Sequence, residues 1–157
     1  MGLDMYLTAS KYVSSSDYNS ETPNAEFSKL IEIMNAESFV GGFIPSVTLD
    51  ISVAYWRKAN AIHQWFINNC TNGEDNCRPM HVSRKQLEQL LNFCKIVDES
   101  KNPNVANEVL PPQSGFFFGT TDIDEWYWDS VQETIEQLER CLNNVPEDWD
   151  FEYRASW

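Results

Sequence analysis

The sequence has no apolar segment long enough to cross a membrane. Hydrophobic residues make up 42% of its 157 residues, but they are interrupted throughout. No run approaches the roughly 20 residues that a membrane-spanning helix needs. The opening residues Met1–Met5 also lack the basic and apolar regions of a secretion signal. We therefore predict a cytoplasmic protein with no membrane partner.

Basic residues are scarce. The chain has 11 Lys and Arg against 24 Asp and Glu, which gives a formal net charge of −13. Such a charge repels nucleic-acid phosphates, so we expect no direct binding of DNA or RNA. The charge is uneven, however. Residues 122–152 carry eleven acids and one base, whereas residues 57–85 carry five bases and two acids. A local anion site in the second segment is compatible with an acidic protein.

The signatures of common enzyme classes are missing. There is no Gly-x-Ser-x-Gly, no glycine-rich phosphate loop and no dinucleotide fingerprint. With only two histidines, a nucleophile triad has little support. We expect the four cysteines (Cys70, Cys77, Cys94 and Cys141) to be free structural thiols, because their number and spacing do not suit a disulfide scaffold. The sequence thus favours a non-enzymatic protein with no cofactor and no bound metal.

Alternating apolar and polar residues predict the strands. This pattern covers residues 3–9 and 47–53, and it predicts two half-buried strands. The triplet at 116–118, flanked by glycines, predicts a short buried strand. The tail at 149–157 alternates aromatics with acids and predicts an added strand or a docked arm.

Helical spacing predicts the helices. It covers residues 23–36, 55–66, 87–97 and 127–142. Ser83 and Gln86 form a capping box at the start of the third. Neither a repeat nor a low-complexity linker divides the chain. We therefore predict one α+β domain over residues 1–157, in which about four helices pack on a small sheet.

Four separated runs of sequence resemble those of a known group of proteins. The runs are Met1-Gly-Leu-Asp-Met-Tyr-Leu7, Tyr55-Trp-Arg-Lys-Ala-Asn-Ala-Ile-His63, Gly73-Glu-Asp-Asn-Cys77 and Gly115-Phe-Phe-Phe-Gly119. They resemble, over nearly the whole chain, a family of small uncharacterised proteins encoded by bacteriophages and bacterial genomes. The resemblance implies a phage or prophage setting, and hence the host cytoplasm, but no activity. By analogy with other phage accessory proteins, it suggests a role in countering host defences.

The candidate ligand site comprises Trp56, Arg57, Lys58, Asn60 and His63. If the second strand ends at residue 53 or 54, Arg57 and Lys58 lie in the first turns of the next helix. Exposed N–H groups there favour an anion, although basic side chains oppose the helix dipole. A bound phosphate would explain their placement. A nucleobase would stack on Trp56 while Asn60 or His63 hydrogen-bonds to it.

This pattern predicts binding of a small phosphate-bearing or nucleotide-like ligand, with residues 116–118 as a further wall. The alternative is that Trp56 belongs to the core while Arg57 and Lys58 pair with the acidic last helix.

Trp126, Tyr127 and Trp128 add a constraint, because at 100° per residue three consecutive aromatics do not face one core. At least one of them must lie at a pocket, at a dimer surface or beneath the tail.

Two other functions remain open. The acidic segment 122–152 suggests an interaction protein, or a nucleic-acid mimic, that binds a basic host protein. The third hypothesis is a metal-dependent hydrolase that uses Asp122, Asp124, Glu125 and Asp129, although these acids lack the EF-hand order. His63, Cys70, Cys77 and His81 have the chemistry of zinc ligands, but their spacing is wider than that of zinc fingers, and we expect no zinc. The sequence indicates no particular oligomeric state.

Overall fold

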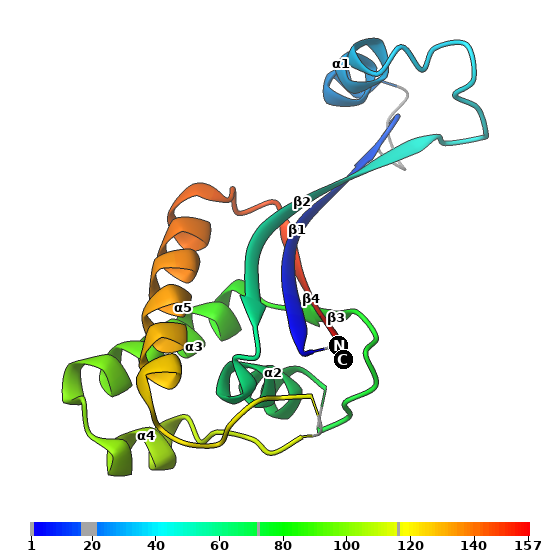
Figure 1. Cartoon of the computed structure of the whole chain (residues 1–157). Helices are drawn as coiled ribbons and strands as arrows, with labels where there is room; N and C mark the ends of the chain where they lie inside the picture. The colour runs from blue at the N-terminus through cyan, green and yellow to red at the C-terminus, as the bar shows by residue number, and fades with distance from the viewer. Residues whose placement is uncertain (1, 17–21, 72, 116) are drawn as a thin grey trace. The chain divides into compact units, whose positions relative to one another are not determined.

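The computed structural model describes residues 2–16, 22–71, 73–115 and 117–157 (Figure 1). Asp17, Asn72 and Phe116, for which the sequence predicts a loop, a turn and a strand, lie outside them. The architecture is α+β, as predicted. The elements are β1 (Asp4–Ser14), α1 (Ala25–Ile33), β2 (Ser46–Arg57), α2 (Asn60–Cys70), β3 (Met80–Val82), α3 (Arg84–Ser100), α4 (Pro103–Val109), α5 (Glu125–Asn144) and β4 (Asp150–Ser156).

The chain forms two compact units. Unit 1 comprises Met1–Ala9 and Ser52–Trp157, and unit 2 is the continuous segment Ser10–Ile51. Strands β1 and β2 contribute residues to both units. The single undivided domain expected from the sequence stays a prediction.

The strands form one antiparallel sheet in the order β2-β1-β4-β3. The tail prediction is confirmed as β4, whose Tyr153 pairs with Met80 of β3. The strand predicted at 116–118 is wrong for its described residues. Phe118 lies in a turn, where its N–H donates to the carbonyl of Gly115 at 3.2 Å. Three consecutive apolar residues are too few to separate a buried strand from a buried turn.

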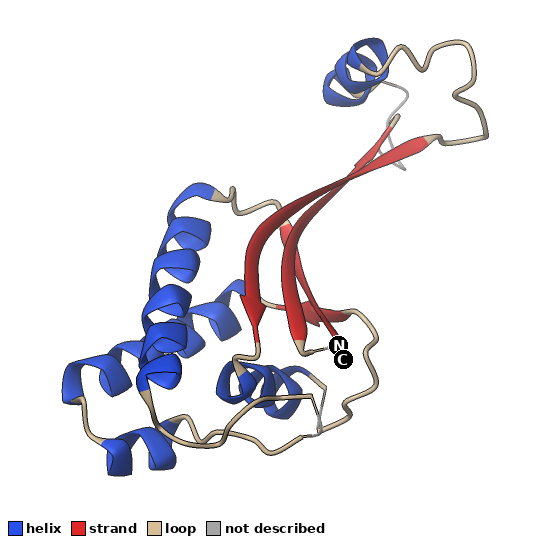
Figure 2. Cartoon of the chain, viewed as in Figure 1, coloured by secondary structure: helices blue, strands red, loops and turns tan. Residues whose placement is uncertain are grey.

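In unit 1, one face of the sheet carries the core. Leu3, Met5 and Leu7 are fully buried at alternate positions, and Tyr153 and Phe151 of β4 repeat the pattern. Helices cover this face in Figure 2, and they add buried residues such as Phe66, Leu90 and Leu138. The alternation thus decides which face of the sheet the helices cover.

Strand β2 continues further than its sequence suggests. It runs to Arg57, and α2 begins only at Asn60, so the helix predicted over 55–66 is wrong in its first turn. The side-chain amide of Gln137 in α5 explains the difference. Its Oε1 accepts the N–H of Tyr55 at 2.8 Å, and its Nε2 donates to the carbonyl of Tyr55 at 2.9 Å. Gln137 therefore takes the place of a neighbouring strand along the outer edge of β2.

Unit 2 has a small core of its own. It contains Val13, Phe27, Ile31 and Ala36, with Leu30, Val40 and Val47 packed against them. Helix α1 is shorter than the predicted 23–36. It starts at Ala25, because Asn24 caps it by accepting the N–H groups of Glu26 and Phe27, and it ends at Ile33.

Replacing Gln137 by Met should lower the free energy of unfolding by about 1–3 kcal/mol, because it leaves the N–H and carbonyl of Tyr55 without their partners. Urea unfolding followed by circular dichroism measures this. Gln132→Met, at an exposed position of the same helix, should change stability by less than about 0.5 kcal/mol. Equal stability of the two variants would contradict the edge-pairing role of Gln137.

Candidate functional site

A cavity of about 520 Å³ in unit 1 lies where β2 ends and α2 and α5 begin. We call it the Arg57 cavity. Arg57 and Lys58 form one side, the first turn of α2 forms the floor, and Asp122, Asp124 and Trp126 line the side of α5. Its size falls in the range of small-ligand sites in proteins, roughly 300–1,000 Å³.

Three of the five predicted site residues line this cavity, namely Arg57, Lys58 and Asn60. Trp56 and His63 do not. Trp56 is 1% exposed and its Nε1–H donates to the Thr134 hydroxyl at 2.9 Å, so it belongs to the core. His63 is fully buried. The alternation of β2 separates Trp56 from Arg57, because the two are neighbours in a strand and point to opposite faces.

The backbone at Lys58 joins β2 to α2 in a left-handed conformation, with φ of 57°. This region is uncommon for residues with a side chain. Two hydrogen bonds hold it. The N–H of Lys58 donates to the Leu3 carbonyl at 2.8 Å, and the Lys58 carbonyl accepts the N–H of Asn60 at 2.9 Å. Sparsely populated backbone conformations persist where surrounding contacts fix them, and they are frequent at functional sites.

Helix α2 has no side-chain cap. Among the helices in the described ranges, α1, α3, α4 and α5 are capped by Asn24, Ser83, Asn102 and Asp124. The N-cap position of α2 is Ala59, and its first turn carries no acidic residue. The first amides of a helix lack intrahelical acceptors, and Ala61 and Ile62, which carry two of them, line the Arg57 cavity. Positive potential from this helix end therefore falls within the cavity.

Asn60 holds the wall of the cavity. Its Nδ2 donates to the carbonyls of Phe118 at 3.1 Å and Thr120 at 2.8 Å, and its Oδ1 accepts the N–H of Gln113 at 3.1 Å. It is 6% exposed. All three bonds fasten the segment 113–120 to the start of α2, so Asn60 shapes the site by positioning its wall.

The cavity lining at the start of α5 is acidic. Asp122 accepts a hydrogen bond from the Thr120 hydroxyl at 3.0 Å, and Asp124 caps α5 by accepting the N–H of Tyr127 at 3.2 Å. Trp126, with 77% of its surface exposed, lies on this side. The structure therefore assigns the exposed member of the aromatic run to a pocket, while Tyr127 is buried.

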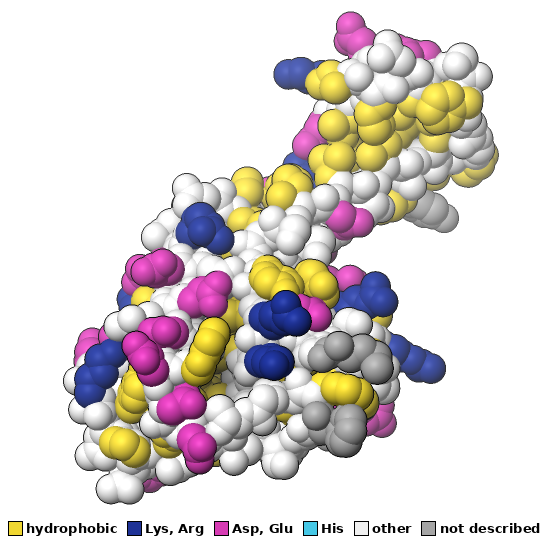
Figure 3. All heavy atoms as spheres, viewed as in Figure 1, with side chains coloured by type: hydrophobic (Ala, Val, Ile, Leu, Met, Phe, Trp, Pro, Cys, Tyr) yellow, Lys and Arg dark blue, Asp and Glu magenta, His cyan; other side chains and the backbone are white. Residues whose placement is uncertain are grey.

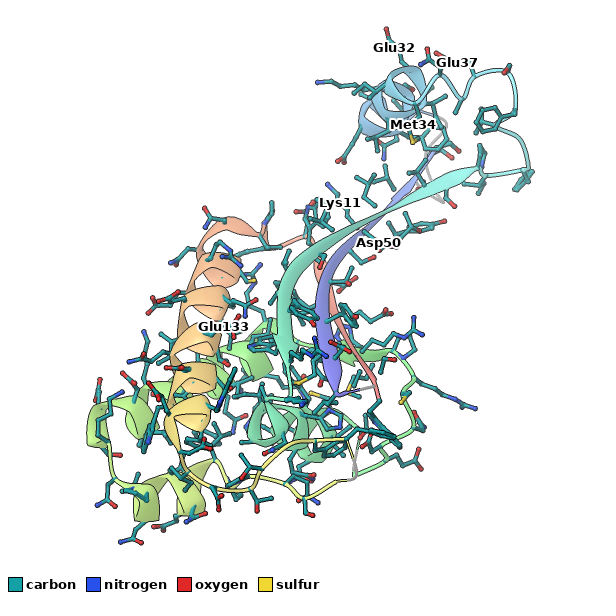
Figure 4. All side chains as sticks on the ribbon, viewed as in Figure 1. Lys11, Glu32, Met34, Glu37, Asp50 and Glu133 are labelled. Carbon is teal, nitrogen blue, oxygen red and sulfur yellow. The ribbon has the colours of Figure 1, made fainter. Side chains whose placement is uncertain are left out.

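In the described part of the chain, Arg57 does not pair with the acids of α5, contrary to the alternative interpretation of the sequence. Its Nε lies 4.0 Å from Oδ1 of Asp4, on β1, and 63% of its side chain is exposed. The acids of α5 form a solvent face instead, which includes Asp129, Glu133 and Glu136 (Figure 3; Glu133 is labelled in Figure 4). Partial burial, and then the neighbouring Glu136, raise the pKa of Glu133 above its ordinary value.

His63 belongs to a separate buried network. Its Nδ1 lies 2.8 Å from the Tyr153 hydroxyl, and its Nε2 lies 3.0 Å from Oδ2 of Asp75. The sequence reasoning missed both partners. Tyr153 is 90 residues away along the chain, and Asp75 lies outside the helices and strands, in a segment without periodicity.

Burial disfavours the thiolate form of Cys70 and Cys94. Burial raises the pKa of Cys70 to about 11 and that of Cys94 well above its usual range. A thiol with such a pKa is protonated at neutral pH and is a poor nucleophile. All four cysteines are free.

Within the described residues, no three His, Cys, Asp or Glu side chains are grouped so that they could hold a metal ion. The same residues include no helix that is long and apolar enough to cross a membrane.

Comparison of the chain with protein-family models, with curated proteins and with solved structures finds no match.

Replacing Asn60 by Asp should loosen the segment 113–120, because the carboxylate loses both donor bonds to Phe118 and Thr120. We expect amide exchange at Gln113 and Phe118 to accelerate at least tenfold, measured by hydrogen exchange. Asn68→Asp, on the exposed side of the same helix, serves as the control. Unchanged exchange in the Asn60 variant would show that other contacts hold the segment.

Proposed function

We propose that this chain binds a small phosphate-bearing, nucleotide-like ligand in the Arg57 cavity. The observation that carries the proposal is the uncapped start of α2, which opens into a cavity whose rim also carries Arg57 and Lys58. Three sources of positive potential thus converge in a chain whose net charge is −13.

The phosphate end of the ligand would lie against the first turn of α2. Helix N-termini bind phosphate through free amides and the helix dipole. Arg57 adds a planar fork that suits phosphate oxygens, and Lys58 adds a point charge. Gly119, which also lines the cavity, has a backbone φ of 89°, a conformation that favours glycine.

The other end of the ligand would face α5. Trp126 presents an exposed indole on which a flat ring would stack. Asp122 has a carboxylate that accepts from Thr120 and retains lone pairs for another donor, such as the exocyclic amine of a nucleobase. Opposite charges on the two walls would orient such a ligand in one direction.

Binding of this kind fits the setting that the sequence resemblance implies. A protein that holds a nucleotide-like signal in the cytoplasm of an infected host would counter a defence by sequestration alone. Binding, with no chemical step, is sufficient for that role.

Arg57→Ala tests the proposal. A panel of mono- and dinucleotides at about 100 times the dissociation constant should raise the wild-type melting temperature by roughly 5–10 °C, from a stabilisation of about 2.7 kcal/mol. The variant should lose most of this rise and keep the ligand-free melting temperature, because its side chain is largely exposed. Arg154→Ala, at an exposed position of β4 outside the cavity, should respond like the wild type. The proposal would be contradicted if no nucleotide raises the melting temperature of the wild type, or if the melting temperature of Arg57→Ala rises as much as that of the wild type.

A second candidate function has its own support in unit 2. Phe43 is 99% exposed and Phe39 is 77% exposed, and Figure 3 shows apolar side chains spread over this unit. Figure 4 shows Met34 with Glu32 and Glu37 near the end of α1. Residues 10–51 carry six acids and two bases. An exposed apolar surface bordered by acids suits a basic, partly apolar surface of a host protein. The acidic sequence suggests such a partner for segment 122–152, which is a different part of the chain.

Phe43→Ser tests this second function. We expect a basic host protein to be retained by the immobilised wild type at low salt and released as salt rises, because acidic surroundings steer the contact. Phe43→Ser should retain much less of it at an unchanged melting temperature. Ile96→Ser, which removes an exposed apolar side chain from unit 1, should behave as wild type. If the Phe43 variant retains as much of the host protein as the wild type, the exposed apolar surface of unit 2 does not take part in binding.

A further inference from the structure

A second cavity in unit 1, of about 480 Å³, has a different chemistry. We call it the Asp75 cavity. Its lining includes the carboxylate of Asp75 and the aromatic rings of Phe117, Phe118 and Trp157, and the described residues that line it include no Lys or Arg. Among the described residues, the two cavities have no lining residue in common, so a ligand of the Asp75 cavity is independent of the nucleotide proposal.

The carboxylate of Asp75 is held in place by two donors. Oδ2 lies 3.0 Å from Nε2 of His63, and Oδ1 accepts a bond from Nε1 of Trp157 at 3.3 Å. Behind His63, the Tyr153 hydroxyl lies 2.8 Å from Nδ1. Two residues, His63 of α2 and Trp157 next to β4, therefore fix one carboxylate at the cavity wall, and Tyr153 of β4 holds His63.

Two hydrogens of this network follow from the groups that surround them. Burial, followed by the charge of Asp75, raises the pKa of Tyr153 well above its usual value, so its hydroxyl keeps its proton. Nε2 of His63 faces Oδ2 of the Asp75 carboxylate, which accepts, so Nε2 carries a hydrogen and donates it.

The aromatic rings form a corner beside this charge. The rings of Phe118 and Trp157 meet edge to face, with centroids 5.9 Å apart and planes at 76°. Phe118 is fixed in turn against His63, at 5.1 Å and 84°. Phe118 is 7% exposed and Trp157 is 44% exposed, so the corner is rigid on one side and open on the other.

We propose that the Asp75 cavity binds an organic ammonium group, either of a free small amine or of a methylated lysine side chain. A cation is attracted to aromatic faces within about 6 Å, and a single carboxylate balances its charge. Methyl groups on the nitrogen would contact the rings of Phe118 and Trp157. Gln64 and Gln113, which also line the cavity, offer amide oxygens for a nitrogen that keeps a hydrogen.

The test monitors the indole Nε1–H signal of Trp157 by ¹⁵N–¹H NMR in the full chain without nucleotide. The probes are choline chloride, which stands for a free small ammonium, and acetyl-trimethyllysine amide, which stands for a modified side chain. Sodium chloride at equal ionic strength corrects for salt. We expect saturable shifts of the Trp157 signal with at least one probe. The probe that binds more tightly shows whether the ammonium group belongs to a free small amine or to a methylated lysine.

Two variants and one control decide the role of the residues. Asp75→Asn keeps an acceptor for His63 but removes the charge, and it should weaken the tighter probe at least tenfold. Glu74→Gln removes the adjacent exposed charge from outside the cavity and should bind as wild type. Trp157→Leu leaves the His63–Asp75 bond intact and should also weaken binding tenfold, monitored through the Gln64 side-chain amide signal. If Asp75→Asn does not fold, Trp157→Leu decides alone.

The proposal is overturned if neither probe shifts the Trp157 signal beyond sodium chloride, or if a folded Asp75→Asn or Trp157→Leu variant binds as tightly as the wild type. Arg57→Ala should bind the ammonium probes unchanged. Failure of the nucleotide site is therefore distinguishable from failure of this one.

Discussion

The three hydrogen bonds of Asn60 are the constraint on which the functional part of unit 1 depends. One buried amide binds Gln113, Phe118 and Thr120, which line the two cavities between them. The described residues of segment 113–120 have no regular secondary structure to hold them. A buried polar group whose bonds are all made rigidifies its surroundings, whereas the loss of one bond leaves a costly unpaired group. The shape of both cavities thus depends on a single side chain at the start of α2.

Two opposite electrostatic environments lie in the same unit. Around the Arg57 cavity, positive potential comes from two side chains and from the uncapped helix α2. In the Asp75 cavity, a single carboxylate with hydrogen bonds to His63 and Trp157 lies beside aromatic rings. Neither environment can be inferred from the net charge of −13, because the field near a site is dominated by the nearest groups. Most of the acids are screened by solvent at the surface.

The sequence predicted the parts of the fold in which local pattern and tertiary contacts agree. The alternation from Leu3 to Ala9 predicted β1, and the Ser83–Gln86 capping box predicted the start of α3, where both of its bonds are present. The pattern failed at residues 55–59, because the side chain that keeps Tyr55 extended lies 82 residues away. The candidate site divided for the same reason. Arg57, Lys58 and Asn60 line the same cavity. Trp56 does not, because residues 55–57 form a strand instead of a helix and its side chain therefore points into the core. The partners of His63 could not be predicted: the run Gly73–Cys77 marks the segment of Asp75, but no local pattern connects Asp75 or Tyr153 with His63.

The position of unit 2 in the chain has a consequence for folding. Ser10–Ile51 separates the two pieces of sequence that build unit 1. Before β1 and β2 pair within unit 1, the intervening segment must be closed as a loop, and the entropy lost in closing it grows with the logarithm of its length. Unit 2 has its own core, whose residues all lie between Val13 and Val47. When it forms first, it brings Ala9 and Ser52 together in the way that a short turn joins a hairpin, and it converts a slow long-range pairing into a fast one.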